Sequence, residues 1–461
     1  MGTKKEMIYS NSPIMIQKFL CNFEGKSIYK KRYSDNFFKK FDEIKYRDKL
    51  SGDEIKKIQI SRLKRQLTLA YEESKYYKEL FDECNFDPYT FNDLNEIGRL
   101  PVQTKDDMRK NIHNMYNKSM LKDSLRTIHT SGTTGKGLIF KETYDCDNER
   151  WAIWWRFRQS LGINFNILSA NFGSKPIVPI KQKKPPFYRE VSALKQVMFS
   201  MFHLNKNNVK YYVTEINEKK IEWIHGFPSI ISTLASLMYE NNLSFDHQIK
   251  FVTTGAEAIR ENQKVIIRKV FGVEPIGHYG LTEPVANISV CEYGNNHVDE
   301  DFSYVEFIPI ENTKNQFKLI GTSFSNDVLF FLRYDTNDIV TIDENPQACK
   351  CGREGRLVKK IEGRYEDTIH LLNGSKVWFL GDAFKDMVNV KGVQIYQYKD
   401  YTIDFNIIKN IKYSENDEVL LRKEIEKRVD CIYNLNYIDK LQTYKNNKFK
   451  FSYSELNYEE K

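Results

Sequence analysis

The sequence predicts an α/β fold with an additional β-rich part and a small α+β region toward its C-terminal end. Three observations support this prediction. Between about 150 and 345, helix-like runs alternate with short β-rich runs, which is typical of a sheet with helices packed against it. Toward the end of this part, three β-rich runs stand without convincing helices between them. After about Gly363, the sequence changes to a strand-like run, an amphipathic helix and a lysine-rich tail.

Residues 1 to about 100 are predicted to be mostly helical, and the clearest amphipathic stretch is 58–81. Pro101 interrupts this pattern just before a glycine-rich segment. In the alternating part, we expect helices at 229–242 and 260–272, and strands at 250–255 and 274–280.

The three later β-rich runs, 302–310, 316–324 and 329–334, predict an antiparallel sheet or a small barrel. A strand at 401–408 and an amphipathic helix at 418–429 predict the small α+β region. We therefore expect a large domain of residues 1–363 and a small domain of residues 364–461, joined through the sequence GRYEDTI.

Composition limits the classes of function. The 461 residues carry a net charge of +8, from 70 basic and 62 acidic residues, without a long basic block. This balance argues against a nucleic-acid partner and suits an anionic ligand. No apolar run approaches the ~20 residues of a membrane span, and we expect no membrane partner and no signal peptide. The seven scattered cysteines favour a reducing cytoplasm over a disulfide framework.

The segment 130–137 reads TSGTTGKG. It is not a Walker loop, because Thr130 stands where that motif needs its first glycine and Gly137 where it needs Ser or Thr. Glycines still allow backbone N–H groups to face a phosphate, hydroxyls add donors and Lys136 adds positive charge. A flexible surface hairpin is the alternative. The candidate phosphate-binding residues are Thr130, Ser131, Gly132, Thr133, Thr134, Gly135 and Lys136.

This segment resembles the phosphate-binding loop of the adenylate-forming superfamily, which includes the acyl-CoA synthetases. Further matches follow in the order of that superfamily: TTGAE (253–257), HYGLTEP (278–284), RYDTNDIV (333–340) and the hinge-like EGRYEDTI (362–369). The runs CEYGNNHVDEDF, CKCGREGRLVKKIEGRYED and TYKNNKFKFSYSEL resemble the phenylacetate–CoA ligase branch, especially its CapK-like relatives associated with capsular polysaccharides.

The resemblance implies a role for each matching residue. Thr282 touches the α-phosphate, Glu283 binds Mg²⁺, Asp338 holds the ribose, and Lys448 bridges the acid and the α-phosphate. Glu366 is the expected hinge. The implied catalytic residues are Lys136, Thr282, Glu283 and Lys448, and the other implied nucleotide-binding residues are Gly255, Ala256, Glu257, Tyr279, Gly280, Asp338, Arg353 and Arg364.

Three positions depart from the family pattern. Asn337 and Asn447 replace glycines, and Asn tolerates a left-handed backbone better than most residues. Glu366 stands where Asp is common. Lys445 and Lys450 lie near Lys448, so a solvated lysine-rich tail is the alternative there.

Four residues form a candidate metal site: Cys291, His297, Cys349 and Cys351. Three thiolates and one imidazole make a closed tetrahedral set without a place for a catalytic water. The phenylacetate–CoA ligase branch often carries a zinc at such positions, which implies structural Zn²⁺. The alternative is a buried cysteine beside an accidental Cys-x-Cys pair.

The resemblance implies an ATP-dependent ligase with a mobile C-terminal lid that activates a carboxylic acid as its acyl adenylate. The expected cofactors are ATP, Mg²⁺, structural Zn²⁺ and coenzyme A; the acceptor could instead be a carrier-protein thiol or a sugar amine or hydroxyl. A nucleotide-binding scaffold without catalysis and a zinc-stabilised interaction module remain alternatives. A homodimer is compatible with the resemblance. Six aromatic residues fit a substrate pocket or a core equally well: Trp154, Trp155, Phe202, His225, Phe227 and Tyr279.

Overall fold

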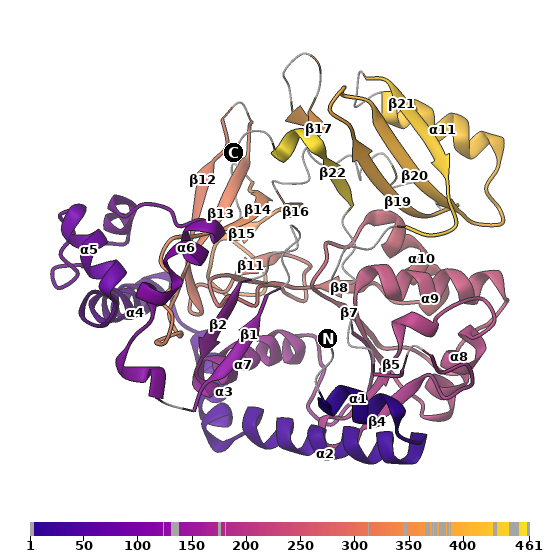
Figure 1. Ribbon diagram of the computed structural model, residues 1–461, viewed down its shortest axis with the longest axis horizontal. Coiled ribbons are helices and arrows are strands. Elements are labelled where there is room, and N and C mark those ends of the chain that lie inside the picture. Colours follow the sequence, from indigo (N-terminus) through magenta and orange to yellow (C-terminus); the bar gives the residue numbers. More distant parts are fainter. Residues whose placement is uncertain are drawn as a thin grey trace. The chain divides into compact units, whose positions relative to one another are not determined.

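A computed structural model describes most of the chain: residues 4–122, 124–130, 138–173, 177–179, 181–311, 313–343, 348–364, 369–370, 372, 376–377, 384, 387, 389–426, 431–441 and 451–458. Its contacts divide the chain into two compact units (Figure 1). The first unit comprises Met1–Tyr29, Asn164–Gly277 and Tyr365–Lys461, and the second comprises Lys30–Ile163 and His278–Arg364.

The first unit contains the predicted alternating region as a six-stranded sheet. Its strands run in the order β4-β5-β3-β6-β7-β8, parallel except for the antiparallel pair β4–β5. The elements are β3 (Ser169–Phe172), β4 (Tyr188–Val191), β5 (Gln196–Phe199), α8 (Val209–Glu218), β6 (Trp223–Gly226), α9 (Pro228–Glu240), β7 (Phe251–Thr254), α10 (Glu261–Phe271) and β8 (Pro275–Gly277). The strand and helix faces meet in one apolar core. The predicted α/β layer is therefore confirmed.

The C-terminal part of the first unit is a second, mixed sheet with a helix. The strand order is β21-β20-β19-β22, and α11 (Glu415–Glu426) contributes Leu421 and Ile425 to the core. The predicted strand and helix are both present. The strands are β19 (Val390–Gln397), β20 (Ile403–Lys409), β21 (Tyr433–Tyr437) and β22 (Ser452–Ser454), with a separate pair β17 (Ile369–His370) and β18 (Lys376–Val377).

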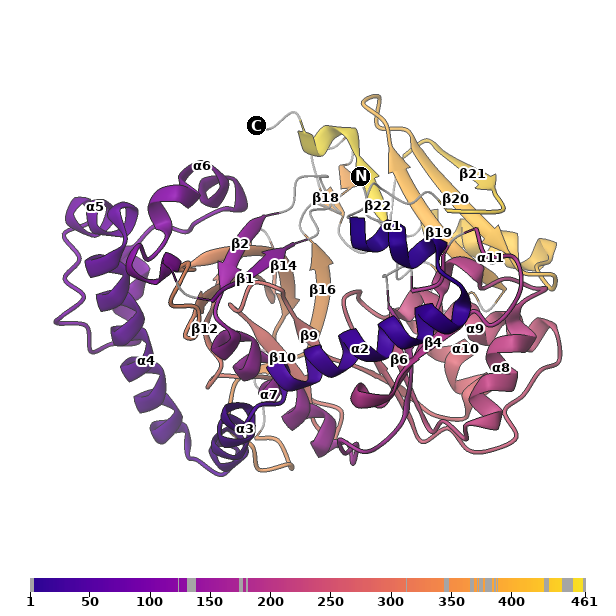
Figure 2. The ribbon, with the colours of Figure 1, turned by 60° about the horizontal axis from the view of Figure 1, so that its bottom comes forward.

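The N-terminal hundred residues are helical, as predicted: α1 (Lys4–Asn11), α2 (Ile14–Arg32), α3 (Asp35–Arg47), α4 (Gly52–Glu73) and α5 (Lys75–Glu83) (Figure 2). The predicted stretch 58–81 is divided between two helices. Ser74 breaks it because its backbone is extended and its hydroxyl accepts a hydrogen bond from the N–H of Tyr77, which starts α5. Among the described helices, none has the length and apolar character that crossing a bilayer requires.

The second unit carries two antiparallel sheets, ordered β15-β11-β10-β9 and β12-β13-β14-β16, and the pair β1–β2. Its later elements are α6 (Lys105–Met115), β1 (Arg126–His129), β2 (Ile139–Glu142), α7 (Tyr144–Ser160), β9 (Tyr279–Gly280), β10 (Asn287–Val290), β11 (Asn296–Val298), β12 (Ser303–Pro309), β13 (Gln316–Ser323), β14 (Tyr334–Thr341), β15 (Leu357–Val358) and β16 (Lys360–Arg364). The antiparallel prediction for this region is confirmed.

One predicted strand is wrong. Residues 329–334 are almost entirely outside the ladder, and β14 begins at Tyr334. Phe330 and Phe331 are fully buried, and their carbonyls accept from the Tyr77 hydroxyl and the Ser323 N–H. The apolar run therefore reflects burial on all sides, and its backbone is satisfied by Tyr77 and by the end of β13 without forming a strand of its own.

Candidate functional site

Two motifs of the sequence meet in the second unit. Tyr279, on β9, donates its hydroxyl to Oδ2 of Asp338, on β14, at 2.7 Å. Tyr334, at the start of β14, donates its hydroxyl to Oε1 of Glu283 at 3.3 Å. We call these four residues the tyrosine–carboxylate site. HYGLTEP and RYDTNDIV are thus joined by two hydrogen bonds.

The backbone around Asp338 explains one departure from the family pattern. Asn337 has φ of 61°, in the left-handed region, and its N–H donates to Oδ1 of Asp335 at 2.8 Å. The N–H of Asp338 donates to Oγ1 of Thr336 at 3.1 Å. This turn suits glycine or asparagine. Across the β14–β16 ladder, Asp338 lies opposite Arg364.

Both carboxylates of the site are buried: Glu283 is 6% exposed and Asp338 is 8% exposed. Burying a charged carboxylate is costly unless hydrogen bonds or cations compensate it. Thr282, in contrast, is exposed. The site therefore combines two buried acceptors with an exposed hydroxyl, which fits binding of a polyhydroxyl group or a cation.

The structure describes only the two ends of the predicted phosphate-binding loop. Residues 131–137, which include Ser131 to Lys136, lie outside the described residues, as do Glu366 and Lys448. The two ends of the loop are described. The N–H of Thr130 donates to the carbonyl of Leu138 at 2.8 Å, and the N–H of Leu138 donates to Oγ1 of Thr130 at 2.9 Å. Thr130 thus closes the base of the loop.

The TTGAE segment begins with the last two residues of β7 in the first unit and continues into the turn after it. The N–H of Gly255 donates to the carbonyl of Gly226 at 3.3 Å, and Ala256 has φ of 65°. Glu257 accepts a hydrogen bond from the N–H of Ser229, in the first turn of α9, at 3.2 Å. A carboxylate at a helix N-terminus is stabilising, so Glu257 has a structural contact of its own.

The predicted metal ligands come together. One ligand atom from each of Cys291, His297, Cys349 and Cys351 lies within 4.8 Å of all the others. We call these residues the cysteine–histidine cluster. The Sγ atoms of Cys291 and Cys349 are 3.6 Å apart, and Sγ of Cys351 lies 3.3 Å from Nε2 of His297.

Two glycine turns present the sulfur atoms. Gly294 and Gly352 both have left-handed φ angles, 79° and 73°. Their N–H groups donate to the carbonyls of Cys291 and Cys349, at 2.9 and 3.1 Å. Such tight turns require glycine because a Cβ is unfavourable at positive φ. His297 reaches the cluster from β11, which pairs with β10 and β15.

The pKa shifts in the cluster favour the ligand form of His297 and Cys349 and oppose the thiolate form of Cys351. Burial, with a smaller contribution from Arg353, lowers the pKa of His297 to about 4 and keeps its imidazole neutral. Burial opposes ionisation of Cys349, but hydrogen bonds from the Cys351 backbone and from Asn295 outweigh it and lower its pKa. Burial raises the pKa of Cys351 to about 12.

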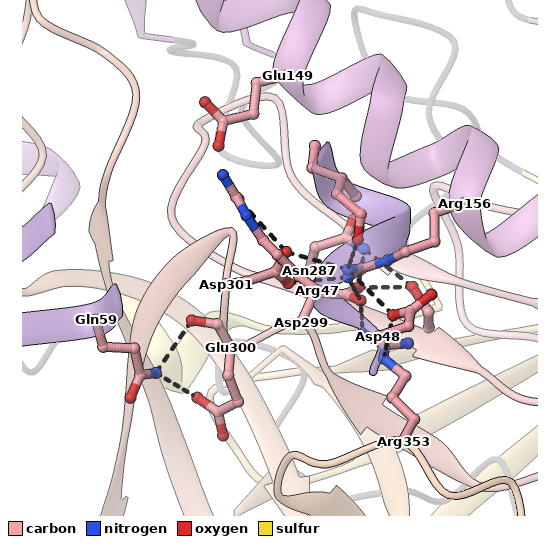
Figure 3. Close-up of polar contacts among 12 residues, drawn as sticks. Arg47, Asp48, Gln59, Glu149, Arg156, Asn287, Asp299, Glu300, Asp301 and Arg353 are labelled. Atoms are coloured by element: carbon pink, nitrogen blue, oxygen red, sulfur yellow. Dashed lines mark hydrogen bonds and ion pairs between the residues drawn. The ribbon is translucent and has the colours of Figure 1, made fainter. Parts of the chain in front are cut away.

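Sequence reasoning missed a buried ionic network in the second unit (Figure 3). Arg156, on α7, donates to Oδ1 of Asp299 at 2.7 Å and to Asp301 at 3.0 and 3.1 Å, and it lies 3.2 Å from Asp48. Arg353, predicted to bind a cofactor, pairs with Asp299 and lies 3.3 Å from Asp48. We call these five residues the Arg156 network. Arg156 belongs to no recognisable motif, so the sequence held no clear signal for it.

The six candidate pocket aromatics are divided between the units. Trp154, Trp155 and Tyr279 lie in the second unit, and Phe202, His225 and Phe227 lie in the first. Trp155 is 6% exposed and donates to the hydroxyl of Tyr33 at 2.9 Å. This contact supports the core interpretation for Trp155.

Comparison with known proteins shows which proteins this chain is similar to. No protein-family model matches the chain. It is 27% identical to Protein CapK of Staphylococcus aureus over 361 residues, which cover 78% of each chain. It is 23% identical to the phenylacetate-coenzyme A ligase of Thermus thermophilus over 350 residues (71% of this chain, 74% of the relative). For the same ligase of Escherichia coli, the identity is 24% over 344 residues (71% and 75%).

In sequence, the chain is similar to CapK and to phenylacetate–CoA ligases. The predicted resemblance is thereby confirmed. Among solved structures, 2-hydroxyisobutyryl-CoA ligase with 2-HIB-AMP matches 89% of this chain and 91% of its own, with a TM-score of 0.68 and 16% identity. A second complex of that ligase, with R3-HIB-AMP, gives a TM-score of 0.67 at 15% identity. These matches show that the chain shares the fold of 2-hydroxyisobutyryl-CoA ligase.

Proposed function

We propose that this protein is an ATP-dependent ligase that activates a carboxylic acid as an acyl adenylate and then transfers the acyl group to a thiol. One observation carries the proposal: HYGLTEP and RYDTNDIV are joined through Tyr279–Asp338 and Tyr334–Glu283. The related phenylacetate–CoA ligases match the chain over 70% of its length or more, which supports the same reaction class.

The chemistry requires control of negative charge. A carboxylate that attacks the α-phosphate of ATP approaches an anion and expels pyrophosphate, so positive groups and in-line positioning must lower the barrier. We assign charge neutralisation to Lys136 and to the amides of the loop that Thr130 closes. We assign contact with the α-phosphate to the exposed hydroxyl of Thr282, and Lys448 is the proposed bridge between acid and phosphate.

Asp338 and Glu283 have separate proposed tasks. The buried Asp338 carboxylate, oriented by the Tyr279 hydroxyl, can accept hydrogen bonds from both ribose hydroxyls. Glu283 is a buried oxygen donor beside Tyr334, and carboxylate oxygens suit Mg²⁺. When bound, Mg²⁺ would neutralise phosphate charge.

We propose that the cysteine–histidine cluster holds a structural Zn²⁺. The donor set fits: three sulfur atoms and one neutral imidazole nitrogen are already within 4.8 Å of one another. Four protein ligands leave no open coordination position, so the metal would stabilise the fold and not act on substrate. It would tie the β10–β11 turn to the segment that leads into β15.

Coenzyme A is the proposed acceptor because the related ligases are named for it. The test has two stages. First, exchange of labelled pyrophosphate into ATP is measured against a panel of aryl and aliphatic acids with Mg²⁺; we expect acid-dependent exchange. Exchange reports the first half-reaction whatever the acceptor is.

Second, the active acid is incubated with ATP and with coenzyme A, an amine or a sugar, and the products are identified by mass spectrometry. We expect the coenzyme A thioester. An amide or an ester would keep the adenylation proposal and reassign the acceptor. ATP binding without exchange for any acid would support a scaffold, and the lack of both would overturn the proposed function.

A further inference from the structure

Asn287 connects the Arg156 network to the strand that carries Tyr279. On the β9–β10 ladder, Asn287 lies directly opposite Gly280, and Ile288 lies opposite Tyr279. The Asn287 side chain therefore lies against the motif proposed to bind the nucleotide. Asn287 itself lies outside the sequence motifs that predicted the site.

The orientation of the Asn287 amide is fixed by two different partners. Its Oδ1 accepts a hydrogen bond from Nε1 of Trp154 at 3.0 Å. Its Nδ2 donates to Oδ2 of Asp299, and also lies 3.3 Å from Oγ of Ser289. Because the indole can only donate and the carboxylate can only accept, a flipped amide would lose both bonds.

Asp299 is held firmly enough to act as an anchor. It is fully buried, and burial alone would oppose its charge. Arg353, Arg156, Ser289 and Asn287 all donate to it (Figure 3). Its own N–H donates to the carbonyl of Asn287 at 3.0 Å. Buried networks whose members are all satisfied are rigid and specify one arrangement.

Gly280 shows how closely this amide approaches the strand. A Cβ on Gly280 would lie 2.7 Å from Oδ1 of Asn287 and 3.3 Å from Nε1 of Trp154. The hydrogen bond between Trp154 and Asn287 therefore passes against the Cα of Gly280. The neighbouring residue, Tyr279, makes the bond to Asp338.

We propose that Asn287 is a positioning residue for nucleotide binding: anchored by Asp299 and Trp154, it fixes β9 so that Tyr279 meets Asp338. This inference rests on the proposed function of the tyrosine–carboxylate site. It adds a residue that would act through Tyr279 without touching the nucleotide.

The test compares the intact protein with Asn287→Asp, Trp154→Phe and a control, Asn326→Asp. The first variant turns a carboxylate oxygen toward Asp299 in place of a donor. The second removes the indole N–H and keeps an aromatic ring. Asn326 is also fully buried in the second unit, and its amide bonds backbone groups of Lys141 and Val328.

We expect Asn287→Asp to raise the KM for ATP about tenfold or more, with smaller changes in kcat and in the KM for the acid, because a misplaced Tyr279–Asp338 pair weakens nucleotide binding. Trp154→Phe should raise the KM for ATP by about threefold, since one neutral hydrogen bond is lost. Asn326→Asp should lower Tm and leave the KM for ATP unchanged, because a merely structural role does not alter affinity in the folded fraction.

Amide hydrogen exchange of residues 278–282 provides a readout that needs no nucleotide. It should accelerate in both network variants and not in Asn326→Asp. Unchanged exchange there, together with an unchanged KM for ATP, would overturn the positioning role. If the wild-type protein neither binds ATP nor exchanges pyrophosphate, the proposed function fails, and hydrogen exchange alone then decides whether Asn287 fixes β9. If Asn287→Asp does not fold, Trp154→Phe decides by the same two readouts.

Discussion

The cysteine–histidine cluster and the tyrosine–carboxylate site lie in the same unit but draw on the chain differently. The cluster takes all its donors from two short segments, 291–297 and 349–351. The proposed nucleotide site also needs residues 131–137 of the loop and Lys448, which lie outside the described residues. A site built from local turns contains its whole donor set in its own geometry, whereas a site distributed over the chain requires a functional test.

The largest effect should come from breaking the cluster. If it holds a structural metal, Cys349→Ser removes one of four ligands and should destabilise the fold by roughly 5 kcal/mol, because metal-binding energy contributes to folding. Bound zinc, measured by elemental analysis, should fall from about one equivalent to near zero, and denaturant unfolding gives the stability.

Cys84→Ser is the control for this prediction, because Cys84 lies in the same unit and outside the cluster. It should retain zinc and stability. A zinc-free wild-type protein purified without chelator would contradict the metal assignment.

The next largest effect should come from the tyrosine–carboxylate site and should appear in activity and not in stability. Asp338→Asn keeps the side-chain shape but removes the charge that would hold the ribose, so kcat/KM for ATP should fall about 100-fold or more. Unfolding should shift little. Pyrophosphate exchange at varied ATP concentrations measures this loss.

Asp343→Asn makes the matched change just after β14, where Asp343 forms an exposed ion pair with Lys359 at 3.1 Å. It should leave kcat/KM and stability unchanged. Equal losses in the two variants would place the ribose elsewhere.

The sequence predicted some parts of the structure and not others. Alternating periodicity predicted the strands around 250–280, and ordered motifs selected Tyr279, Glu283 and Asp338, which the structure brings together. The run 329–334 misled because an apolar stretch buried on all sides has the composition of a strand. The Arg156 network was not predictable, since Arg156, Asp48 and Asp299 are far apart in the chain and only the fold joins them.

A third prediction concerns acid stability near the site. His278 lies against Trp154 and Phe157, with ring centroids 5.5 and 5.2 Å away. Burial, assisted by Arg158, lowers its pKa to about 4. A base whose folded-state pKa is depressed stabilises the fold fully above its unfolded pKa of about 6.5.

That contribution should be lost as pH falls from about 6.5 toward 4, at a total cost of up to about 3 kcal/mol. His278→Phe should flatten this part of the curve of unfolding free energy against pH. An unchanged slope in His278→Phe would show that His278 is not kept neutral by burial.

The smallest effect concerns the TTGAE turn of the first unit. Ala256 is exposed and has φ of 65°, a conformation that is unfavourable for alanine. Ala256→Gly should therefore stabilise the protein by up to about 1 kcal/mol despite the greater freedom of glycine in the unfolded chain. Ala235→Gly, inside α9, should destabilise it by about the same amount. Thermal unfolding should give a higher Tm for Ala256→Gly and a lower Tm for Ala235→Gly.

The central claim is that the tyrosine–carboxylate site holds the nucleotide. Crystallisation with ATP and Mg²⁺ tests it most directly. We predict ribose hydroxyls bonded to Asp338, the adenine beside Tyr279 and a metal ion at Glu283. A well-ordered ATP bound elsewhere, with Asp338 still bonded only within the protein, would contradict the claim.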